Sequence, residues 1–471
     1  MKNRSYQILH VEDDDGLASN YGHLVHDVLN SQGLPHEITR ANTIDKAFRI
    51  IGESWRELDL ILLDISLDDD SGRNGLHLVK MLRQNSWKGI PIFVVSANVE
   101  VYKETLDKLI KDQSIIGYSP PLGTWVDKLA DILLGKEVNI LHLSDIHNGK
   151  FFAYNHLVMN RETVLDNLCR KLGHIDLAVI SGDLSSTNSQ EDYADAVELL
   201  GALRNKLSLP HEHFVFVPGN HDHNLAARDS RTFRRYLEFT EGFYNGRQMP
   251  GGRYPGRDLE HYGNYEQVFD ELFSIVAFPE QRTLIVGFNS VNHLDFKTNR
   301  GKKCPVGNGE ICGRIYGGEI SAGQLEKVDR ELKWLYDTHP DYKNYVKCAV
   351  FHHNVFEPAH VEKVPWRPTL MNQGNFFQLL SQHGFRFALH GHLHYKEVHF
   401  YKEYHWKQGI NVISTGTFSG KDRAFDTDFC ANKLTYRVSP RGEISVCRLR
   451  QITLPKDGLD WQESKVKLEL D

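Results

Sequence analysis

The sequence predicts an α/β protein with two domains, and three observations support this prediction. The chain has 471 residues, which is more than a single hydrophobic core ordinarily organises. Short apolar runs alternate with segments whose apolar residues recur at helical spacing, the pattern of strands connected by helices. Hydrophobic residues make up 40% and charged residues 25% of the chain, as in folded proteins.

Five strand–helix units are predicted in the first 135 residues. The predicted strands are 7–11, 36–40, 58–65, 90–96 and 115–118, and the predicted helices are 17–29, 43–51, 76–82, 101–110 and 125–134. The nearly unbroken apolar run at 58–65 suits a strand that is buried on both faces. Together these units predict a doubly wound parallel sheet, with functional residues at the carboxyl ends of its strands.

Three carboxylates and a hydroxyl follow these strands: Glu12 and Asp13, then Asp64, then Ser96. Because neighbouring carboxylates repel one another, a divalent cation with oxygen ligands is the expected compensation. Residues 5–135 resemble the receiver domain of two-component response regulators. The resemblance implies a flavodoxin-like fold in which Glu12 and Asp13 bind Mg²⁺, Asp64 accepts a phosphoryl group and Ser96 is the switch hydroxyl.

The sequence departs from the receiver pattern after the fifth strand. The family has Lys-Pro there, whereas this chain has Ser119 followed by Pro120. The lysine that pairs with the acyl phosphate in the family is therefore missing, and the loop at 66–74 is longer and more acidic than usual. Two interpretations stay open: control through phosphorylation of Asp64, or a receiver fold that takes no phosphate and serves as a docking surface.

The pattern of strands ending in acid or histidine continues in the second domain. We expect a receiver-like domain at 1–136, a second domain at 137–455 and a C-terminal tail at 456–471. In the second domain the predicted strands begin at Val138 and then cover 175–181, 214–218, 274–277, 283–288, 347–351, 385–389, 411–414, 434–438 and 444–448, with helices at 191–204 and 321–336.

Five of these strand ends carry clusters of Asp, His and Asn. They are Asp145-Ile146-His147, Gly182-Asp183, Gly219-Asn220-His221-Asp222, His352-His353-Asn354 and His390-Gly391-His392-Leu393-His394. Singly, a Gly-Asp pair is usually a turn or a helix cap, and a core histidine is usually hydrogen-bonded structure. Their occurrence at five strand ends favours a metal site, where glycine lets the backbone approach a metal or phosphate closely.

This motif series resembles that of the calcineurin-like metallophosphoesterases, over residues 138 to about 450. The resemblance implies a four-layer α/β/β/α sandwich that holds two metal ions through seven side chains. One ion would be held by Asp145, His147 and His394, the other by Asn220, His352 and His392, and Asp183 would bridge both. His221 would face the phosphate, and Asp222 would orient its ring. His353 and His390 are assigned structural or supporting roles.

A two-metal site would explain hydrolysis of a phosphate ester. Two cations about 3.5–4 Å apart lower the pKa of a bridging water, so that hydroxide can attack phosphorus in line at neutral pH. As an imidazolium, His221 could stabilise developing charge or protonate the leaving alkoxide. Nitrogen and carboxylate ligands admit Mn²⁺, Fe, Zn²⁺, Co²⁺ or Ni²⁺, and the sequence does not choose among them.

About 130 residues separate Asp222 from His352. Within them, 228–257 and 292–316 are rich in glycine, arginine and aromatic residues, and we expect irregular insertions near the metal site. Guanidinium groups suit phosphate oxygens, although surface charges are the alternative. The arginines concerned are Arg231, Arg234, Arg235, Arg247, Arg253 and Arg257.

The sequence thus predicts a metal-dependent phosphoesterase, most specifically a phosphodiesterase, regulated through the receiver-like domain. Its expected partners are a phosphate-ester substrate and a sensor kinase or other signalling partner, and a homo-oligomer stays open. A metal-dependent nuclease and a signalling adaptor with a degenerate receiver are the alternatives. The net charge of -7 gives no drive toward nucleic acid or anionic membrane.

Location is inferred from what the sequence lacks. No apolar run reaches membrane-spanning length, and the N-terminus does not lead into a signal-peptide core. The six cysteines are scattered and are interpreted as reduced thiols, with a Cys304–Cys312 bridge as the alternative. We therefore expect a bacterial, cytoplasmic protein.

Overall fold

The computed structural model describes residues 5–31, 33–55, 57–67, 74–84, 90–112, 114–121, 125–126, 129–147, 160–224, 230–244, 265–291, 317–356, 369–419, 428–439, 442–455 and 459–470. The chain forms two compact units. Unit 1 comprises Met1–Glu137 with Arg437–Ser445, and unit 2 comprises Val138–Tyr436 with Val446–Asp471.

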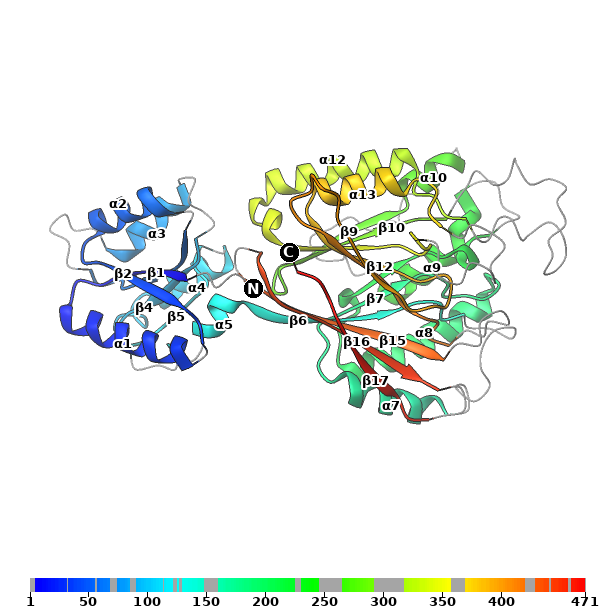
Figure 1. Ribbon diagram of the computed structural model, residues 1–471, viewed down its shortest axis with the longest axis horizontal. Coiled ribbons are helices and arrows are strands. Elements are labelled where there is room, and N and C mark those ends of the chain that lie inside the picture. Colours follow the sequence, from blue (N-terminus) through cyan, green and yellow to red (C-terminus); the bar gives the residue numbers. More distant parts are fainter. Residues whose placement is uncertain are drawn as a thin grey trace. The chain divides into compact units, whose positions relative to one another are not determined.

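Unit 1 contains a five-stranded sheet of order β2-β1-β3-β4-β5 in which every pair is parallel (Figure 1). Its strands are β1 (Tyr6–Val11), β2 (His36–Ala41), β3 (Leu58–Leu63), β4 (Ile92–Val95) and β5 (Gly117–Ser119). Its helices are α1 (Asp15–Ser31), α2 (Ile44–Ser54), α3 (Gly75–Gln84), α4 (Lys103–Lys111) and α5 (Leu129–Leu134). The predicted doubly wound sheet is confirmed.

Both faces of this sheet are buried, which explains the continuous apolar run of β3. Ile61 and Leu63 of this strand pack in the core with α2 and α3. Leu60 and Leu62 point the other way, into the core that contains Tyr21 of α1. Because successive strand residues face opposite sides, a strand covered by helices on both sides has no polar position in its middle.

Unit 2 is built on two six-stranded sheets, of order β13-β14-β12-β11-β10-β9 and β17-β16-β15-β6-β7-β8. The first contains β9 (Phe273–Phe278), β10 (Thr283–Phe288), β11 (Val346–Val350), β12 (Phe385–His390), β13 (Val398–Tyr401) and β14 (Ile410–Ser414). The second contains β6 (Lys136–Leu143), β7 (Leu177–Ser181), β8 (Phe214–Val217), β15 (Phe429–Val438), β16 (Ile444–Leu454) and β17 (Gln462–Lys467).

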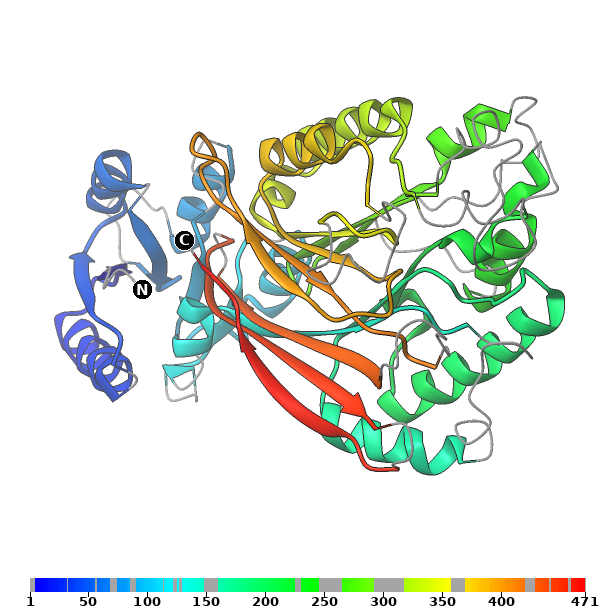
Figure 2. The ribbon, with the colours of Figure 1, turned by 45° about the vertical axis from the view of Figure 1, so that its right-hand side comes forward.

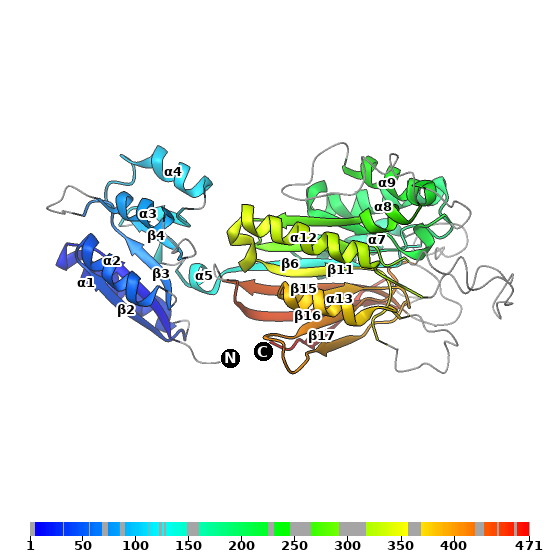
Figure 3. The same cartoon turned by 90° about the horizontal axis from the view of Figure 1, so that it is seen from above.

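Helices cover the sheets of unit 2 and complete the predicted α/β/β/α sandwich. α12 (Ala322–Thr338) and α13 (Gln373–Gln382) share a core with the first sheet, and Figure 3 looks down on them. α7 (Arg161–Leu172) and α8 (Gln190–Leu207) lie beside the second sheet (Figure 2). α9 (Arg234–Tyr244) and α10 (Tyr265–Glu271) follow β8 in the chain.

The prediction of an irregular segment at 228–257 is wrong for residues 230–244, the part that the structure describes. Residues 228–257 were expected to be an insertion without regular structure, but Ser230–Phe233 forms a 3-10 turn that continues into α9. The apolar face of α9 is buried, including Tyr236, Phe239 and Phe243, so packing of these aromatic residues stabilises a helix despite the arginines around it. The other predicted insertion, 292–316, lies outside the described residues.

The tail predicted at 456–471 is also wrong for the residues described. β17 pairs antiparallel with β16, from Arg448 opposite Lys467 to Thr453 opposite Gln462. Trp461, only 2% exposed, precedes this strand, and its indole N–H donates to the backbone oxygen of Val164 in α7 at 3.0 Å. A buried indole with a satisfied N–H is an anchor, so this segment belongs to the sandwich.

The cysteines and the helix lengths bear on two further expectations, reduced thiols and the lack of a membrane-spanning segment. Cys169, Cys348, Cys430 and Cys447 are free thiols, while Cys304 and Cys312 lie outside the described residues. Among the helices that the structure describes, none has the length and apolar character needed to cross a membrane.

The burial of Trp461 predicts that this C-terminal segment contributes to stability. Trp461→Ala should lower the stability of unit 2 by about 3–5 kcal/mol, the range for truncating a buried tryptophan. Leu459→Ala, at a position that is 42% exposed, is the matched control and should change stability by less than about 0.5 kcal/mol. Thermal unfolding followed by fluorescence and circular dichroism measures both. Equal midpoints for Trp461→Ala and the parent protein would show that the segment is dispensable.

Candidate metal centre

Both sheets of unit 2 contribute to one cluster of side chains. β6, β7 and β8 are parallel neighbours in one sheet, and β11 and β12 are parallel neighbours in the other. Each of the five predicted motifs follows the carboxyl end of one of these strands. Because parallel strands end at the same edge, the motifs of each sheet lie together, and the two sheets bring both groups to one place.

The backbone at this edge adopts an uncommon conformation. Asp145, His147, Asp183, His392 and His394 have positive φ angles of 52°, 45°, 52°, 81° and 53°. Non-glycine residues seldom occupy this left-handed region, which typically costs about 1–3 kcal/mol, so roughly that much strain is stored at each position. Backbone hydrogen bonds hold the strained residues, such as His147 N–H to the Asp183 oxygen at 2.9 Å. Strain concentrated in this way is characteristic of functional sites.

The first group of side chains consists of Asp145, His147 and His394. The Nε2 atoms of His147 and His394 lie 2.9 Å apart, and Asp145 Oδ1 lies 3.3 Å from the latter. All three residues are buried, and their ligand atoms lie within 4.8 Å of one another. Two imidazole nitrogens and one carboxylate oxygen therefore converge on a single point.

The second group contains Asn220, His352 and His392. The side-chain oxygen of Asn220 lies 3.0 Å from His352 Nε2, and His392 Nδ1 lies 3.2 Å from the same nitrogen. The ring of His352 is oriented through its other nitrogen, since Nδ1–H donates to the Ser181 oxygen at 2.8 Å. This hydrogen bond places the proton on Nδ1 and leaves the lone pair of Nε2 available for a metal ion.

Asp183 lies between the two groups. Its Oδ2 atom is 3.5 Å from His147 Nε2 and 3.2 Å from His352 Nε2. Its Oδ1 atom accepts a hydrogen bond from the backbone N–H of His221 at 2.8 Å. The carboxylate of Asp183 therefore reaches one histidine of each group.

The donor set fits divalent transition-metal ions. Asp145 Oδ1 is fully buried and accepts no hydrogen bond in the described part of the chain, with His394 Nε2 3.3 Å away. A buried carboxylate oxygen that accepts no hydrogen bond is unfavourable unless a positive charge neutralises it. Imidazole nitrogens together with carboxylate and amide oxygens are ligands for Zn²⁺, Mn²⁺, Fe, Co²⁺ or Ni²⁺, so the residues present match the group that the motif implies.

The charges of the cluster are strongly coupled. Burial alone would raise the pKa of Asp145, but His394 and His147 hold that pKa well below its usual range. Burial likewise opposes ionisation of Asp183, and His352 and His221 outweigh it, so its pKa is also depressed. Burial lowers the pKa of His352, but the Asp183 carboxylate outweighs it and raises this pKa to about 9. Both carboxylates are therefore anionic at neutral pH.

Three glycines allow the ligands to approach the neighbouring backbone. A Cβ atom on Gly219 would overlap Oδ1 and the backbone nitrogen of Asp183. One on Gly391 would overlap Ser144 and Asp145, and one on Gly182, whose φ is 96°, would press on the ring of His352. The motif glycines are thus required by close contact with the candidate ligand residues or their neighbours.

The carboxylate of Asp222 has partners that the sequence did not indicate. Its carboxylate accepts hydrogen bonds from the backbone N–H groups of Gly219, Leu184 and Ser185, at 2.9, 3.2 and 3.1 Å, and from the Tyr193 hydroxyl at 2.9 Å. This carboxylate therefore ties two loops together. The ring of His221 is oriented by a different group, because its Nδ1–H donates to the Ser186 oxygen at 2.7 Å. Burial and then the charge of Asp183 raise the pKa of Asp222 to about 6.

The two remaining motif histidines have structural surroundings, as expected. Ser290 Oγ lies 2.9 Å from His353 Nδ1 and accepts the backbone N–H groups of His352 and His353 at 3.1 Å each. The ring of His390 stacks on Phe351, with centroids 5.4 Å apart. These contacts fix the loops from which the neighbouring ligands project.

Three of the six candidate phosphate-binding arginines are described. Arg234 pairs with Glu238 on the exposed surface of α9, at 2.8 Å. Arg235 donates to the backbone oxygen of Asn188, in the loop that follows Asp183. Arg231 lies in the turn before α9. Arg247, Arg253 and Arg257 lie outside the described residues.

The acidic residues of unit 1 also converge. Ligand atoms of Glu12, Asp13 and Asp64 lie within 4.8 Å of one another, at the carboxyl ends of β1 and β3. Burial and the charge of Asp64 raise the pKa of Glu12 to about 7, and burial raises the pKa of Asp64 as well. Raised carboxyl pKa values show that negative charge is poorly compensated here, which a bound cation would relieve. Ser96 lies 3.2 Å from Ser66, hydroxyl to hydroxyl.

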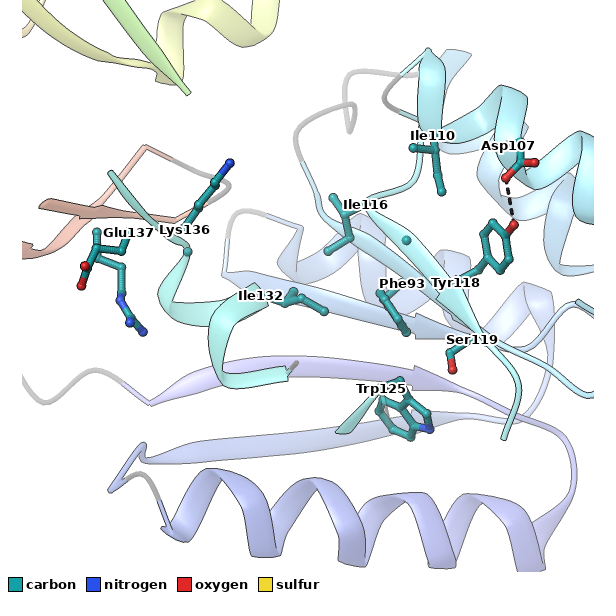
Figure 4. Close-up of a pocket in the computed structure, with 13 residues that line it drawn as sticks. Phe93, Asp107, Ile110, Ile116, Tyr118, Ser119, Trp125, Ile132, Lys136 and Glu137 are labelled. Carbon is teal, nitrogen blue, oxygen red and sulfur yellow. Dashed lines mark hydrogen bonds between the residues drawn. The ribbon is translucent and has the colours of Figure 1, made fainter. Parts of the chain in front are cut away.

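A pocket of about 830 Å³ in unit 1 is separate from these acids (Figure 4). Phe93, Ile116 and Trp125 are among the residues that line it, and Tyr118 donates to Asp107 at 2.8 Å. None of the three acidic residues belongs to its lining. The pocket is therefore not the acidic cluster.

Sequence reasoning missed three residues that support the centre: Ser186, Asp192 and Tyr193. The Ser186 oxygen accepts a hydrogen bond from the ring of His221, and the Tyr193 hydroxyl donates to Asp222. Asp192 accepts a hydrogen bond from the backbone N–H of Ser186. A weak signal existed, because Ser189 and Asp192 have the spacing of a helix N-cap. That spacing could have placed the start of α8, but it does not reveal which loop the buried carboxylate binds.

Comparison with known proteins gives one family. A family model described as calcineurin-like phosphoesterase matches residues 138–396, more than half of the chain. No curated protein shows a significant match.

Solved structures of two kinds are similar to this chain. A purple acid phosphatase from yellow lupin is 12% identical, with a TM-score of 0.36, and the match covers 70% of this chain and 54% of that one. The chain thus spans about half the length of the lupin protein. A two-component response regulator from Legionella pneumophila is 27% identical over 27% of this chain and 98% of its own, with a TM-score of 0.22. A receiver domain from Clostridium thermocellum is 14% identical, covers 26% and 88%, and has a TM-score of 0.22.

The contact between Gly219 and Asp183 predicts that a single methyl group weakens metal binding. Gly219→Ala should displace the Asp183 carboxylate and lower metal affinity by about 10- to 100-fold, the size known for disturbed support of a ligand. Metal content after loading and dialysis, determined by mass spectrometry, measures this. Gly242→Ala is the matched control, since no atom lies within 4 Å of the added carbon. Equal metal content in both variants would contradict the assignment of Asp183.

Proposed function

The chain belongs to the calcineurin-like phosphoesterase family, and we propose that it is a metal-dependent phosphodiesterase with a binuclear metal site. The observation that carries this proposal is the place of Asp183, whose carboxylate lies between His147 and His352 and so between two groups of metal-competent side chains. We assign one ion to Asp145, His147 and His394 and the other to Asn220, His352 and His392, with Asp183 shared.

In this proposal the metal ions and the protein contribute different parts of the chemistry. Two bound cations supply positive charge for the phosphate oxygens and a water of lowered pKa. The strained backbone and the glycines keep the ligands in place before substrate arrives, so little reorganisation is needed. Buried loops around Asp145 and Asp183 exclude bulk water, which strengthens every charge interaction inside.

His221 is the proton donor in this proposal. Its Nδ1–H is held by the Ser186 oxygen, and its ring lies edge-on to that of the ligand His147, with centroids 4.8 Å apart. Nε2 is thus the nitrogen that we assign to the substrate. As the bond between phosphorus and the leaving oxygen breaks, the proton on Nε2 passes to that oxygen, and the ring becomes neutral.

The central prediction concerns Asp183. Asp183→Ala should lower the rate of Mn²⁺-dependent hydrolysis of bis-(p-nitrophenyl) phosphate by more than about 100-fold, which exceeds the effect of losing an outer partner of a ligand. Asp195→Ala, an exposed position on α8, is the control and should keep the parent rate. An Asp183→Ala variant as active as the parent protein would refute the binuclear mechanism.

We further propose that the acidic cluster of unit 1 regulates this activity. Asp64 would attack the phosphorus of an acyl phosphate donor, forming a phosphoaspartate and releasing the carboxylate of the donor. Glu12 and Asp13 would hold the Mg²⁺ that the reaction needs, and Ser96 would contact the new phosphate. A sensor kinase would be the second donor, and its phosphorylated side chain would take the place of the acyl phosphate.

Regulation through Asp64 predicts a response that one substitution abolishes. Incubation with acetyl phosphate and Mg²⁺ should change the esterase rate of the parent protein by at least about 5-fold, the lower range of allosteric coupling, and should leave Asp64→Asn unaffected. Phosphate-affinity electrophoresis should show a shifted band only for the parent protein. Identical rates and a single band in all four conditions would favour the alternative, a receiver fold used as a docking surface.

The substrate separates the phosphodiesterase from the remaining alternative, a nuclease. The net charge of -7 disfavours polyanions, which proteins usually bind through clustered lysine and arginine. A cyclic nucleotide is therefore the substrate class that we favour over single-stranded DNA. A panel containing both, assayed with the same metal, decides between them.

A further inference from the structure

A single buried carboxylate organises the turn that follows Asp183. Asp192, in the first turn of α8, is 5% exposed. Its Oδ2 atom accepts hydrogen bonds from Ser185 Oγ at 2.8 Å, from the backbone N–H of Ser186 at 3.1 Å, and from the backbone N–H and the hydroxyl of Thr187 at 2.8 and 2.9 Å. Four donors from three successive residues thus meet one oxygen.

Ser186 connects this carboxylate to the metal centre. Its backbone N–H donates to Asp192, its backbone oxygen accepts the ring N–H of His221 at 2.7 Å, and its hydroxyl donates to the backbone oxygen of His147 at 2.6 Å. The backbone N–H, the backbone oxygen and the hydroxyl of Ser186 thus each take part in a hydrogen bond. A shift of the turn by a fraction of an ångström would therefore move both the His221 ring and the backbone of a ligand.

The far end of the turn, at Asn188, is held by Ser185 and by Arg235. Asn188 has a φ of 54°, its N–H donates to Ser185 Oγ at 2.6 Å, and its oxygen accepts a hydrogen bond from Arg235. The near end is fixed by Asp192. With both ends held, the direction of the Ser186 carbonyl is determined.

We propose that Asp192 is a positioning residue for the proton donor His221, acting through the Ser186 peptide. The negative charge orients this peptide, and the peptide oxygen keeps the proton of His221 on Nδ1 and its Nε2 toward the substrate. The effect on hydrolysis rests on the proposed function, whereas the effect on the ring does not.

The simpler role of Asp192 is to stabilise the start of α8. Its own N–H donates to Ser189 Oγ, and a carboxylate in the first turn of a helix interacts favourably with the helix dipole. Burial raises the pKa of Asp192, but its hydrogen bonds outweigh this and lower it, so the carboxylate is charged at neutral pH. A purely structural role predicts lower stability without selective loss of one chemical step.

Leaving-group dependence separates the two roles. Asp192→Asn should lower kcat for an alkyl phosphodiester, whose leaving group needs a proton, by about 10- to 100-fold. For a p-nitrophenyl ester, which needs none, the loss should stay below about 3-fold. Asp176→Asn is the matched control, because Asp176 is also buried and binds a backbone N–H, that of Asn139, at the opposite end of β7. It should affect both esters equally.

Combining variants tests whether Asp192 acts through His221. In a His221→Asn background, Asp192→Asn should cause no further loss of kcat, because residues that act as a unit are not additive. Thr187→Val removes one of the four donors and keeps the carboxylate, so it should show the same selectivity at about 2- to 5-fold. If Asp192→Asn does not fold, Thr187→Val takes its place as the test of the proposal.

A readout without catalysis completes the test. In the metal-free full-length protein labelled with ¹⁵N-histidine, the signals of His221 are identified by their loss in His221→Asn. The neutral ring of His221, the form left after Nε2 has given up its proton, should be a single tautomer with its remaining proton on Nδ1 in the parent protein, and Asp192→Asn should show a mixture. An unchanged tautomer, or equal loss for both esters, would overturn the proposal. A parent protein that hydrolyses no ester would refute the proposed function instead, and the tautomer would still decide the role of Asp192.

Discussion

The position of the Asp183 carboxylate is the constraint on which the rest of the centre depends. One oxygen faces His147 and His352, which come from different sheets, and the other accepts the His221 N–H at 2.8 Å. The two sheets must therefore meet within a narrow range for a single carboxylate to contact both histidines. Gly219 makes this possible, because any side chain there would occupy the volume of the carboxylate. The packing of the two sheets and the geometry of the site therefore depend on each other.

Two buried carboxylates near this point have opposite tasks, and their pKa values show it. Asp183 is surrounded by imidazoles, which depress its pKa. For Asp222, burial and then the charge of Asp183 raise the pKa to about 6, although its backbone N–H partners act in the opposite direction. Asp222 fixes the loops after β7 and β8 through three N–H groups. The strained φ angles of the candidate ligands persist because such contacts determine the loops from several sides. Without them, the left-handed backbone at Asp183 would relax.

The sequence was sufficient for the features that depend on spacing along the chain. Parallel strands end at a common edge, so the motifs after them could be placed together before their contacts were known. It was insufficient where a partner is distant or ambiguous. Asp222 stands beside His221 in the sequence, yet it binds the loop of Leu184. Tyr236, Phe239 and Phe243 have helical spacing, but the surrounding arginines and glycines suggested an irregular segment. Trp461 could be recognised as an anchor only once Val164 was seen beside its indole.

The missing lysine changes how a phosphoryl group on Asp64 would be received. A basic residue, Arg40, does lie beside the acidic loop, but its guanidinium is directed to the backbone oxygens of Glu12 and Asp13 and to the side chain of Asp15. It therefore stabilises the loop and does not take the place of the lysine. Among the described residues that follow Asp64 and β4, Ser66, Ser96 and Asn98 are neutral. The hydroxyls of Ser66 and Ser96 contact each other, and Asn98 donates to both, through its side-chain amide at 2.7 Å and its backbone N–H at 3.3 Å. A new phosphate would compete with these hydrogen bonds, since its oxygens are stronger acceptors than a hydroxyl. The coupling in this chain would therefore depend on hydroxyl and amide groups where the family uses a cation.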